Sequence, residues 1–190
     1  MEVERFILIL LQIKTQDTML KRTIKDYSMP KLLGGVFPMD KITFLYGESG
    51  VGKTVSAIKA LNESDVVPIL IDYDHNLSPE VNGCKYIHID GYAIKKTDNV
   101  IKNEVIIIDT YAKMDMKILK MLEPFNTIII IGHNKGIATK TDIPDADEEF
   151  VNHVGSKLYL AYNKKYGTYN LTVFKCRGYS GDRIIADWMR

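Results

Sequence analysis

The chain has 190 residues, of which 46% are hydrophobic and 26% charged, an ordinary composition for one globular domain with a sizeable core. Its formal net charge of +1 neither indicates nor excludes a nucleic-acid partner, so any basic surface must be local. The two cysteines, Cys84 and Cys176, do not have the spacing of a zinc site, and we expect reduced thiols in a cytoplasmic compartment.

The first apolar run, residues 6–11, is too short to span a bilayer, which takes about 20 residues. Gln12 and Lys14 interrupt it and no small-residue cleavage site follows, so we predict neither a membrane span nor a signal peptide. The run either packs on the core as a first helix or strand, or forms an exposed arm that docks on a neighbouring subunit. We divide the chain into an N-terminal extension, residues 1–29, which is a candidate oligomerisation arm, and a core domain, residues 30–190.

Four segments predict the strands of a buried sheet: residues 41–46, 66–71, 104–109 and 126–132. The last three are continuous apolar runs, which are typical of parallel strands covered on both faces. Residues 53–63 and 113–122 carry apolar side chains at three-residue spacing and predict helices between the strands. This alternation predicts an α/β fold, with a mostly parallel twisted sheet and helices on both faces.

The last quarter of the chain has a different pattern. Residues 156–163 and 168–176 predict two strands joined by a turn at Gly167, which is a hairpin signal. Residues 183–188 would form a short final strand. The sheet is therefore predicted to have a parallel centre and an antiparallel edge.

The segment FLYGESGVGKT, residues 44–54, matches the pattern G-x-x-x-x-G-K-[ST] between an apolar strand and an amphipathic helix. Glycines let backbone amides wrap around phosphate oxygens, and a helix N-terminus adds the positive end of its dipole. Lys53 would reach the β- and γ-phosphates, and the Thr54 hydroxyl would ligate Mg²⁺. The residues predicted to bind ATP are Gly47, Glu48, Ser49, Gly50, Val51, Gly52, Lys53, Thr54 and Val55.

A nucleotide site of this kind needs an acidic residue at the end of a neighbouring strand to hold Mg²⁺ through water. Asp109 follows four apolar residues and is the candidate, with an ordinary strand-end cap as the alternative.

Hydrolysis also needs a group that orients or deprotonates the attacking water. Asp72 and Asp74 follow one predicted strand and His133 follows another, at the strand ends where ligands bind in open α/β sheets. We favour Asp74 as the base, with Asp72 as a structural cap or a supporting group. His133 either senses the γ-phosphate or is a satisfied strand-end histidine.

With these residues in place, the chain resembles the RecA-type ATPases, the group of the RecA and RadA recombinases and the DnaB-type helicases. LLGGVFPMDKITFLYGESGVGKT is similar to the opening of that core, and LIDYDHNLSP to the stretch that carries the water-activating acid. That acid falls on Asp74, where the family more often has glutamate; His133 stands in place of the commoner glutamine. Asp109 takes the place of the Mg²⁺-associated acid.

The resemblance covers roughly residues 30–188 and extends to the C-terminal segment VFKCRGYSGDRIIADW. In the family, a Lys-x-Arg pair there reaches the ATP of the adjacent subunit, which implies that role for Lys175 and Arg177; otherwise both are strand-end cations that face solvent. The resemblance includes neither the N-terminal domain of helicases nor the extra C-terminal domain of RecA, so we expect a minimal core. The chain resembles the minimal cores of small viral and archaeal members, and a viral protein would work in the host cytoplasm.

The resemblance also places DNA-contacting loops after Asp109 and His133. Tyr111 and Lys113 in the first loop could stack a base and pair a phosphate. The second loop, residues 134–152, offers Lys135 and Lys140. It also holds five acids, Asp142, Asp145, Asp147, Glu148 and Glu149. Binding to DNA phosphates requires cationic side chains, so either only residues 135–140 contact DNA or the loop contacts a protein partner.

The resulting prediction is an ATP-binding and ATP-hydrolysing homo-oligomer that acts on single-stranded DNA in recombination, repair or replication, with ATP and Mg²⁺ at the interfaces of a head-to-tail filament or ring. One alternative is a ring-forming helicase or packaging motor. The other is a slow, nucleotide-switched regulatory or assembly ATPase without DNA binding.

Overall fold

A computed structural model describes residues 42–75, 77, 83–94, 101–135, 144–165, 168–176 and 186–189. Residues 1–29 and the site residues Lys140 and Arg177 lie outside the described part of the chain. The strands are β1 Thr43–Gly47, β2 Ile69–Asp72, β3 Ile87–Asp90, β4 Val105–Asp109, β5 Thr127–His133, β6 Ser156–Asn163, β7 Thr168–Cys176 and β8 Ala186–Met189. The helices are α2 Lys53–Asn62, the short 3₁₀ helix η4 Tyr111–Lys113, α3 Met116–Leu122 and α4 Glu148–His153.

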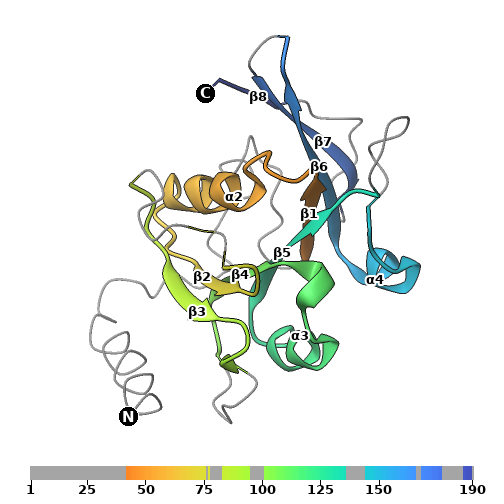
Figure 1. The fold of residues 1–190 in the computed structure, drawn as a ribbon. Helices are drawn as coiled ribbons and strands as arrows, with labels where there is room; N and C mark the ends of the chain where they lie inside the picture. Colours follow the sequence, from red (N-terminus) through yellow and green to blue (C-terminus); the bar gives the residue numbers. More distant parts are fainter. Residues whose placement is uncertain are drawn as a thin grey trace.

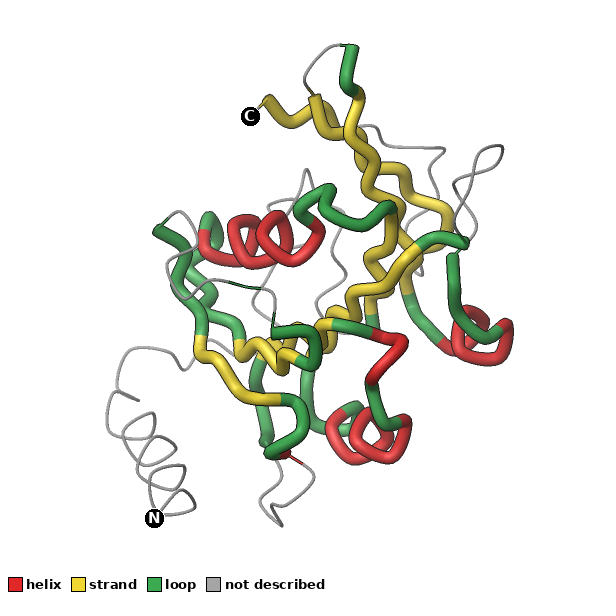
Figure 2. The backbone as a smooth tube through the Cα atoms, viewed as in Figure 1, coloured by secondary structure: helices red, strands yellow, loops and turns green. Residues whose placement is uncertain are grey.

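Within the described residues the strands form one eight-stranded sheet in the order β3-β2-β4-β5-β1-β6-β7-β8. The pairs from β3 to β6 are all parallel, and β7 and β8 each run antiparallel to the preceding strand. Figure 2 shows the strands as a continuous band with helices on either side. The predicted α/β fold, with its parallel centre and antiparallel edge, is confirmed.

Two hydrophobic clusters cover the two faces of the sheet. Side chains alternate along β1, so that Leu45 faces one cluster and Phe44 the other. The Leu45 cluster lies under α2 and includes Ile58 and Leu61, and the Phe44 cluster includes Leu119 of α3. In Figure 1, α2 lies on one side of the sheet, and α3 and α4 lie on the other. The central strands are buried from both sides, which explains their continuous apolar sequence.

Two elements of the structure, β3 and α4, were not predicted from the sequence. The edge strand β3 has Ile89 as its one fully buried residue, so it contains no apolar run. The predicted second loop, residues 134–152, is wrong over its last part, because α4 begins at Glu148. Phe150 is the buried residue of α4, and the acids Glu148 and Glu149 lie in its first turn, where the helix dipole favours negative charge.

The predicted helix at residues 113–122 is also shorter, since α3 begins at Met116 after the Asp115 carboxylate caps it by accepting a hydrogen bond from the Lys117 amide. Across the described residues, no helix combines the length and apolar character that a bilayer crossing requires.

Candidate nucleotide-binding site

The loop between β1 and α2 has the backbone that a phosphate cradle requires. Gly47 pairs with Leu160 of β6, and a Cβ on Gly47 would overlap the carbonyl oxygen of Leu160. Gly50 and Gly52 have φ angles of 76° and 79°, which residues with a Cβ rarely adopt. No side chain caps the N-terminus of α2, so the amides of its first turn are left for other acceptors, the arrangement that binds phosphate.

Lys53, the first residue of α2, is buried, with 5% of its surface exposed. Its Nζ donates hydrogen bonds to the carbonyl oxygens of Glu48, at 2.7 Å, and Gly47, at 3.3 Å. Burial lowers the pKa of Lys53, against the attraction of the Asp109 and Asp74 carboxylates. The ammonium group therefore lies inside the loop, close to Asp109 at the end of β4 and Asp74 just after β2.

Thr54 and Asp109 meet across the sheet, although β5 separates β1 from β4. The Thr54 hydroxyl donates a hydrogen bond of 2.5 Å to Asp109 Oδ2. Burial raises the pKa of Asp109 and the carboxylates of Asp74 and Asp72 add to the rise, while the Thr54 hydrogen bond and Lys53 oppose it. The structure thus brings the two predicted magnesium ligands together where negative charge is crowded.

Asp72 and Asp74 have different environments despite their close spacing. Asp72 is 1% exposed, and its Oδ1 accepts hydrogen bonds from the amides of Asp74, at 2.9 Å, and His75, at 2.8 Å. Its Oδ2 lies 3.2 Å from His88 Nε2 on β3. Asp72 therefore caps the turn that carries Asp74, the structural role that the sequence left open for it.

Asp74 forms an ion pair with a residue expected to contact DNA. The 3₁₀ helix η4 follows Asp109 and a cis peptide bond to Thr110, and it ends at Lys113. Lys113 Nζ lies 2.7 Å from Asp74 Oδ1, with the two side chains 50% and 18% exposed. The hydrogen bond that Lys113 donates to the Asp74 carboxylate raises the pKa of Lys113. No sequence pattern signals this pair, because its members follow different strands.

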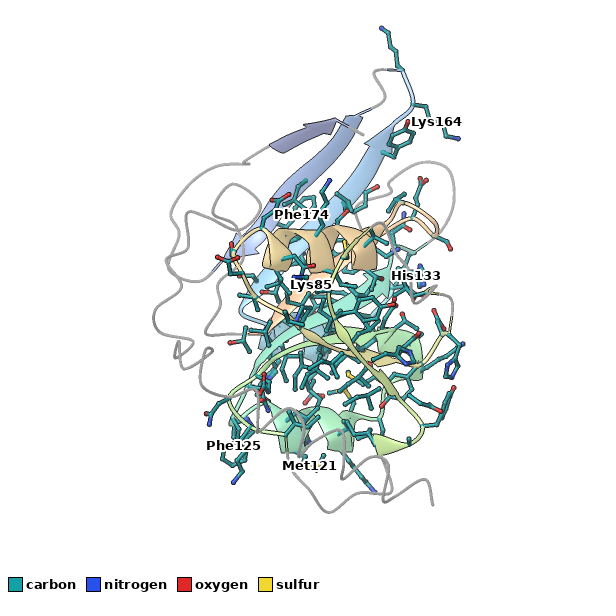
Figure 3. The ribbon with its side chains drawn as sticks, turned by 90° about the vertical axis from the view of Figure 1, so that its left-hand side faces the viewer. Lys85, Met121, Phe125, His133, Lys164 and Phe174 are labelled. Carbon is teal, nitrogen blue, oxygen red and sulfur yellow. The ribbon has the colours of Figure 1, made fainter. Side chains whose placement is uncertain are left out.

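His133, at the end of β5, pairs in register with Gly47, the residue that opens the phosphate loop. Its carbonyl oxygen accepts a 2.8 Å hydrogen bond from the Asp145 amide. The His133 side chain is half-buried, and Figure 3 shows it on the right-hand side of the molecule, far from Phe125 near the start of the same strand. The strand thus places His133 beside the phosphate loop, and its two predicted roles stay predictions.

Tyr111, the aromatic residue expected to stack on DNA, is engaged with the protein. Its ring lies 4.4 Å from that of Phe150 and 5.7 Å from that of Phe44, measured between centroids. Its hydroxyl donates a 2.7 Å hydrogen bond to Asp147, just before α4. Burial and this carboxylate raise the pKa of Tyr111. Tyr111 therefore packs between β1 and α4. The sequence around Tyr111 does not indicate these contacts.

A more exposed aromatic residue, Tyr92, follows β3 and was not predicted. Its side chain is 48% exposed. Its ring stacks on His75 at a centroid distance of 6.1 Å and meets Tyr73 edge-on at 5.5 Å. Because β3 itself has no apolar run, the sequence offered no strand end from which to place Tyr92.

The remaining predicted residues are only partly placed. Lys135 is exposed just after β5. The backbone of Lys175 pairs with Lys157 of β6, while its side chain lies outside the described residues. The roles of Lys135, Lys140, Lys175 and Arg177 therefore stay predictions.

The strand order and the site together define an α/β fold of the P-loop type, with the candidate phosphate loop after β1 and the acid at the end of β4. Among solved structures, the chain is similar to one titled "Crystal structure of the RadB recombinase", with a TM-score of 0.62 and 19% identity over 85% of this chain and 92% of that chain. The chain thus has the RecA-type fold that its sequence predicted. No protein-family model matches the sequence, and no curated protein matches it.

Proposed function

We propose that the protein binds ATP with Mg²⁺ at the β1–α2 loop, hydrolyses it, and acts on single-stranded DNA in recombination, repair or replication. The observation that carries the proposal is the 2.5 Å hydrogen bond between Thr54 and Asp109 beside the buried Lys53. A hydroxyl from the first turn of α2 and a carboxylate from the end of β4 meet here with β5 between their strands. That juxtaposition is the arrangement that P-loop hydrolases use.

The donor set fits Mg²⁺, which prefers carboxylate and hydroxyl oxygens. Three carboxylates interact here, since both Asp74 and Asp72 raise the pKa of Asp109. A divalent cation would relieve that crowding. When bound, Mg²⁺ neutralises negative charge on the phosphates, and Lys53 and the α2 amides bind the phosphate oxygens.

Asp74 is the proposed base that accepts a proton from the attacking water, and His133 is the proposed group beside the γ-phosphate. In a homo-oligomer, filament or ring, Lys175 and Arg177 of an adjacent copy would neutralise charge on the γ-phosphate. Arg177→Ala should then spare nucleotide binding and lower turnover by about 10³-fold or more.

Binding and turnover of ATP test this proposal directly. Lys53→Ala should abolish Mg²⁺-dependent ATP uptake in calorimetry, because the buried ammonium is lost. Lys59→Ala is the matched control, since Lys59 is an exposed lysine on the same helix. Equal ATP uptake by wild type and Lys53→Ala, or none by wild type, would refute the nucleotide site.

The DNA part needs a second measurement, which compares ATP turnover and particle size with and without single-stranded DNA. Stimulated turnover with filaments supports the recombinase-like function. Closed rings with strand displacement would instead identify a helicase-type motor.

One observation favours a second candidate, a slow nucleotide-switched ATPase without DNA binding. The base candidate is an aspartate already paired with Lys113 at 2.7 Å, and Asp147, Glu148 and Glu149 make the start of α4 acidic. Slow turnover that is indifferent to DNA would support this candidate.

A further inference from the structure

Lys113 is held at the boundary between the nucleotide site and solvent. Its amide donates to the Thr110 carbonyl at 3.2 Å, which closes the short helix η4 just after Asp109. Its side chain is 50% exposed, and its Nζ lies 2.7 Å from Asp74 Oδ1. The ammonium group can therefore be reached from solvent while it touches the candidate base.

Asp74 faces both sides of this boundary. At the surface its carboxylate raises the pKa of Lys113, and inside the phosphate loop its charge opposes the lowering of the Lys53 pKa by burial. Its backbone is fixed, because the Asp74 amide donates to the buried Asp72 carboxylate at 2.9 Å. An ammonium at 2.7 Å competes with water for the negative charge on which general-base catalysis depends.

We propose that the Lys113–Asp74 ion pair is a latch on the catalytic base, and that a phosphate of single-stranded DNA opens it by taking the Lys113 ammonium. This inference rests on the proposed function and names the regulation of that site. DNA binding and ATP hydrolysis are then coupled through one lysine, which pairs either with Asp74 or with a phosphate.

The neighbouring Tyr92 identifies the anion as part of a single-stranded nucleic acid. Tyr92 is 48% exposed, stacks on His75, and lies close enough to Lys113 to contribute to its raised pKa. An exposed aromatic ring beside a cation binds an unstacked base together with its phosphate. Duplex DNA keeps its bases stacked, and inorganic polyphosphate has none. Tyr111 cannot serve in the same way without leaving Phe44 and Phe150.

An ion pair this exposed is weak enough to be exchanged. Pairs of this kind shift an equilibrium by about two- to fivefold, while a phosphate contact also gains from the release of counterions. Removal of the ammonium should therefore raise DNA-free turnover by about two- to fivefold.

The test uses Lys113→Met, with Lys117→Met on α3 as the matched control, since Lys117 is an exposed lysine four positions away. We expect Lys113→Met to hydrolyse ATP about two- to fivefold faster than wild type without DNA, and to lose stimulation by an oligo-dT strand. Lys113→Arg, which keeps the pair, should keep the low DNA-free rate. Lys117→Met should behave as wild type.

Tyr92→Leu tests the base contact, with Phe125→Leu as its control, because Phe125 is 44% exposed and lies far from His133 in Figure 3. Tyr92→Leu should weaken stimulation by oligo-dT, whereas duplex DNA and polyphosphate should stimulate wild type poorly. Equal stimulation by polyphosphate and oligo-dT would overturn the assignment to a single strand.

Failure of the latch is distinguishable from failure of the proposed function. If wild type hydrolyses ATP and Lys113→Met hydrolyses it no faster than wild type without DNA, the latch alone is overturned. ATP uptake without turnover in any variant, or no ATP uptake at all, overturns the proposed hydrolysis and the latch together.

Discussion

Substitution of Asp72 distinguishes its structural role from the proposed catalytic role of Asp74. Asp72→Ala removes an acceptor that receives the amides of Asp74 and His75 at 2.9 and 2.8 Å. Each such hydrogen bond to a charged acceptor contributes about 1.5–3 kcal/mol, and relief from burying the carboxylate offsets part of the sum. We expect the free energy of unfolding to fall by about 2–4 kcal/mol, which leaves a typical domain folded at 25 °C.

The assay combines urea denaturation, for the free energy of unfolding, with steady-state ATP turnover. Asp72→Asn keeps an oxygen for both amides, so it should cost about 1 kcal/mol and retain most turnover. Asp74→Asn should behave in the opposite way. Its ion pair with Lys113 is partly solvent-exposed, so stability should change little, while loss of the proposed base should lower turnover by about 10²–10⁴-fold.

Two results would contradict this assignment. A well-folded Asp72→Asn protein without turnover would make Asp72 the base, and normal turnover in Asp74→Asn would remove Asp74 from catalysis. Asp74→Asn also removes the ion-pair partner of Lys113. The ATP turnover of this variant is therefore compared with that of wild type in the absence of DNA.

Four other substitutions probe the site and the core. The pKa of Asp109 is raised, so the folded state binds a proton at this carboxylate more tightly than the unfolded state does. Acidification toward that pKa should therefore favour folding. It should also weaken Mg²⁺-dependent ATP binding, because the protonated carboxyl group loses its charge. Asp109→Asn should accordingly raise the melting temperature and weaken that binding by about 10- to 100-fold in calorimetry; a lower melting temperature with intact Mg²⁺ binding would contradict this. Gly47→Ala should destabilise the fold by about 1–3 kcal/mol or more in urea, because its Cβ overlaps the Leu160 carbonyl oxygen, whereas Gly50→Ala has open space and should cost about 1–2 kcal/mol for its positive φ alone. Phe150→Ala should cost about 3–5 kcal/mol, since Phe150 is 4% exposed, and an unchanged urea midpoint would show that α4 contributes little to the core.

The parts of the fold that could be predicted are those whose own sequence decides their environment. The central residues of β4 and β5 are buried on both faces, so these positions need apolar side chains and the run can be recognised without any partner. Edge strand β3 buries only Ile89 fully, and α4 only Phe150, so neither leaves a periodic pattern.

The phosphate loop could be predicted for the same reason, because all its chemistry lies within eight consecutive residues. The proximity of Thr54 and Asp109 could be inferred only from the rule that ligand-binding residues gather at the carboxyl ends of parallel strands. The Lys113–Asp74 pair and the packing of Tyr111 on Phe150 depend on which strands are neighbours, and that order is decided by the whole sheet.

The pairing of Gly47 with Leu160 has a mechanical consequence. It ties the start of the phosphate loop to β6 without any intervening side chain, and β6 continues the ladder to β7 through Lys157 and Lys175. The regular pairing is interrupted between Lys157 and Leu158, and bending concentrates at such irregularities. A load applied at the hairpin end of β6 and β7 would reach Leu160, and through it Gly47, along regularly paired residues, because the irregular step lies on the far side of Leu160.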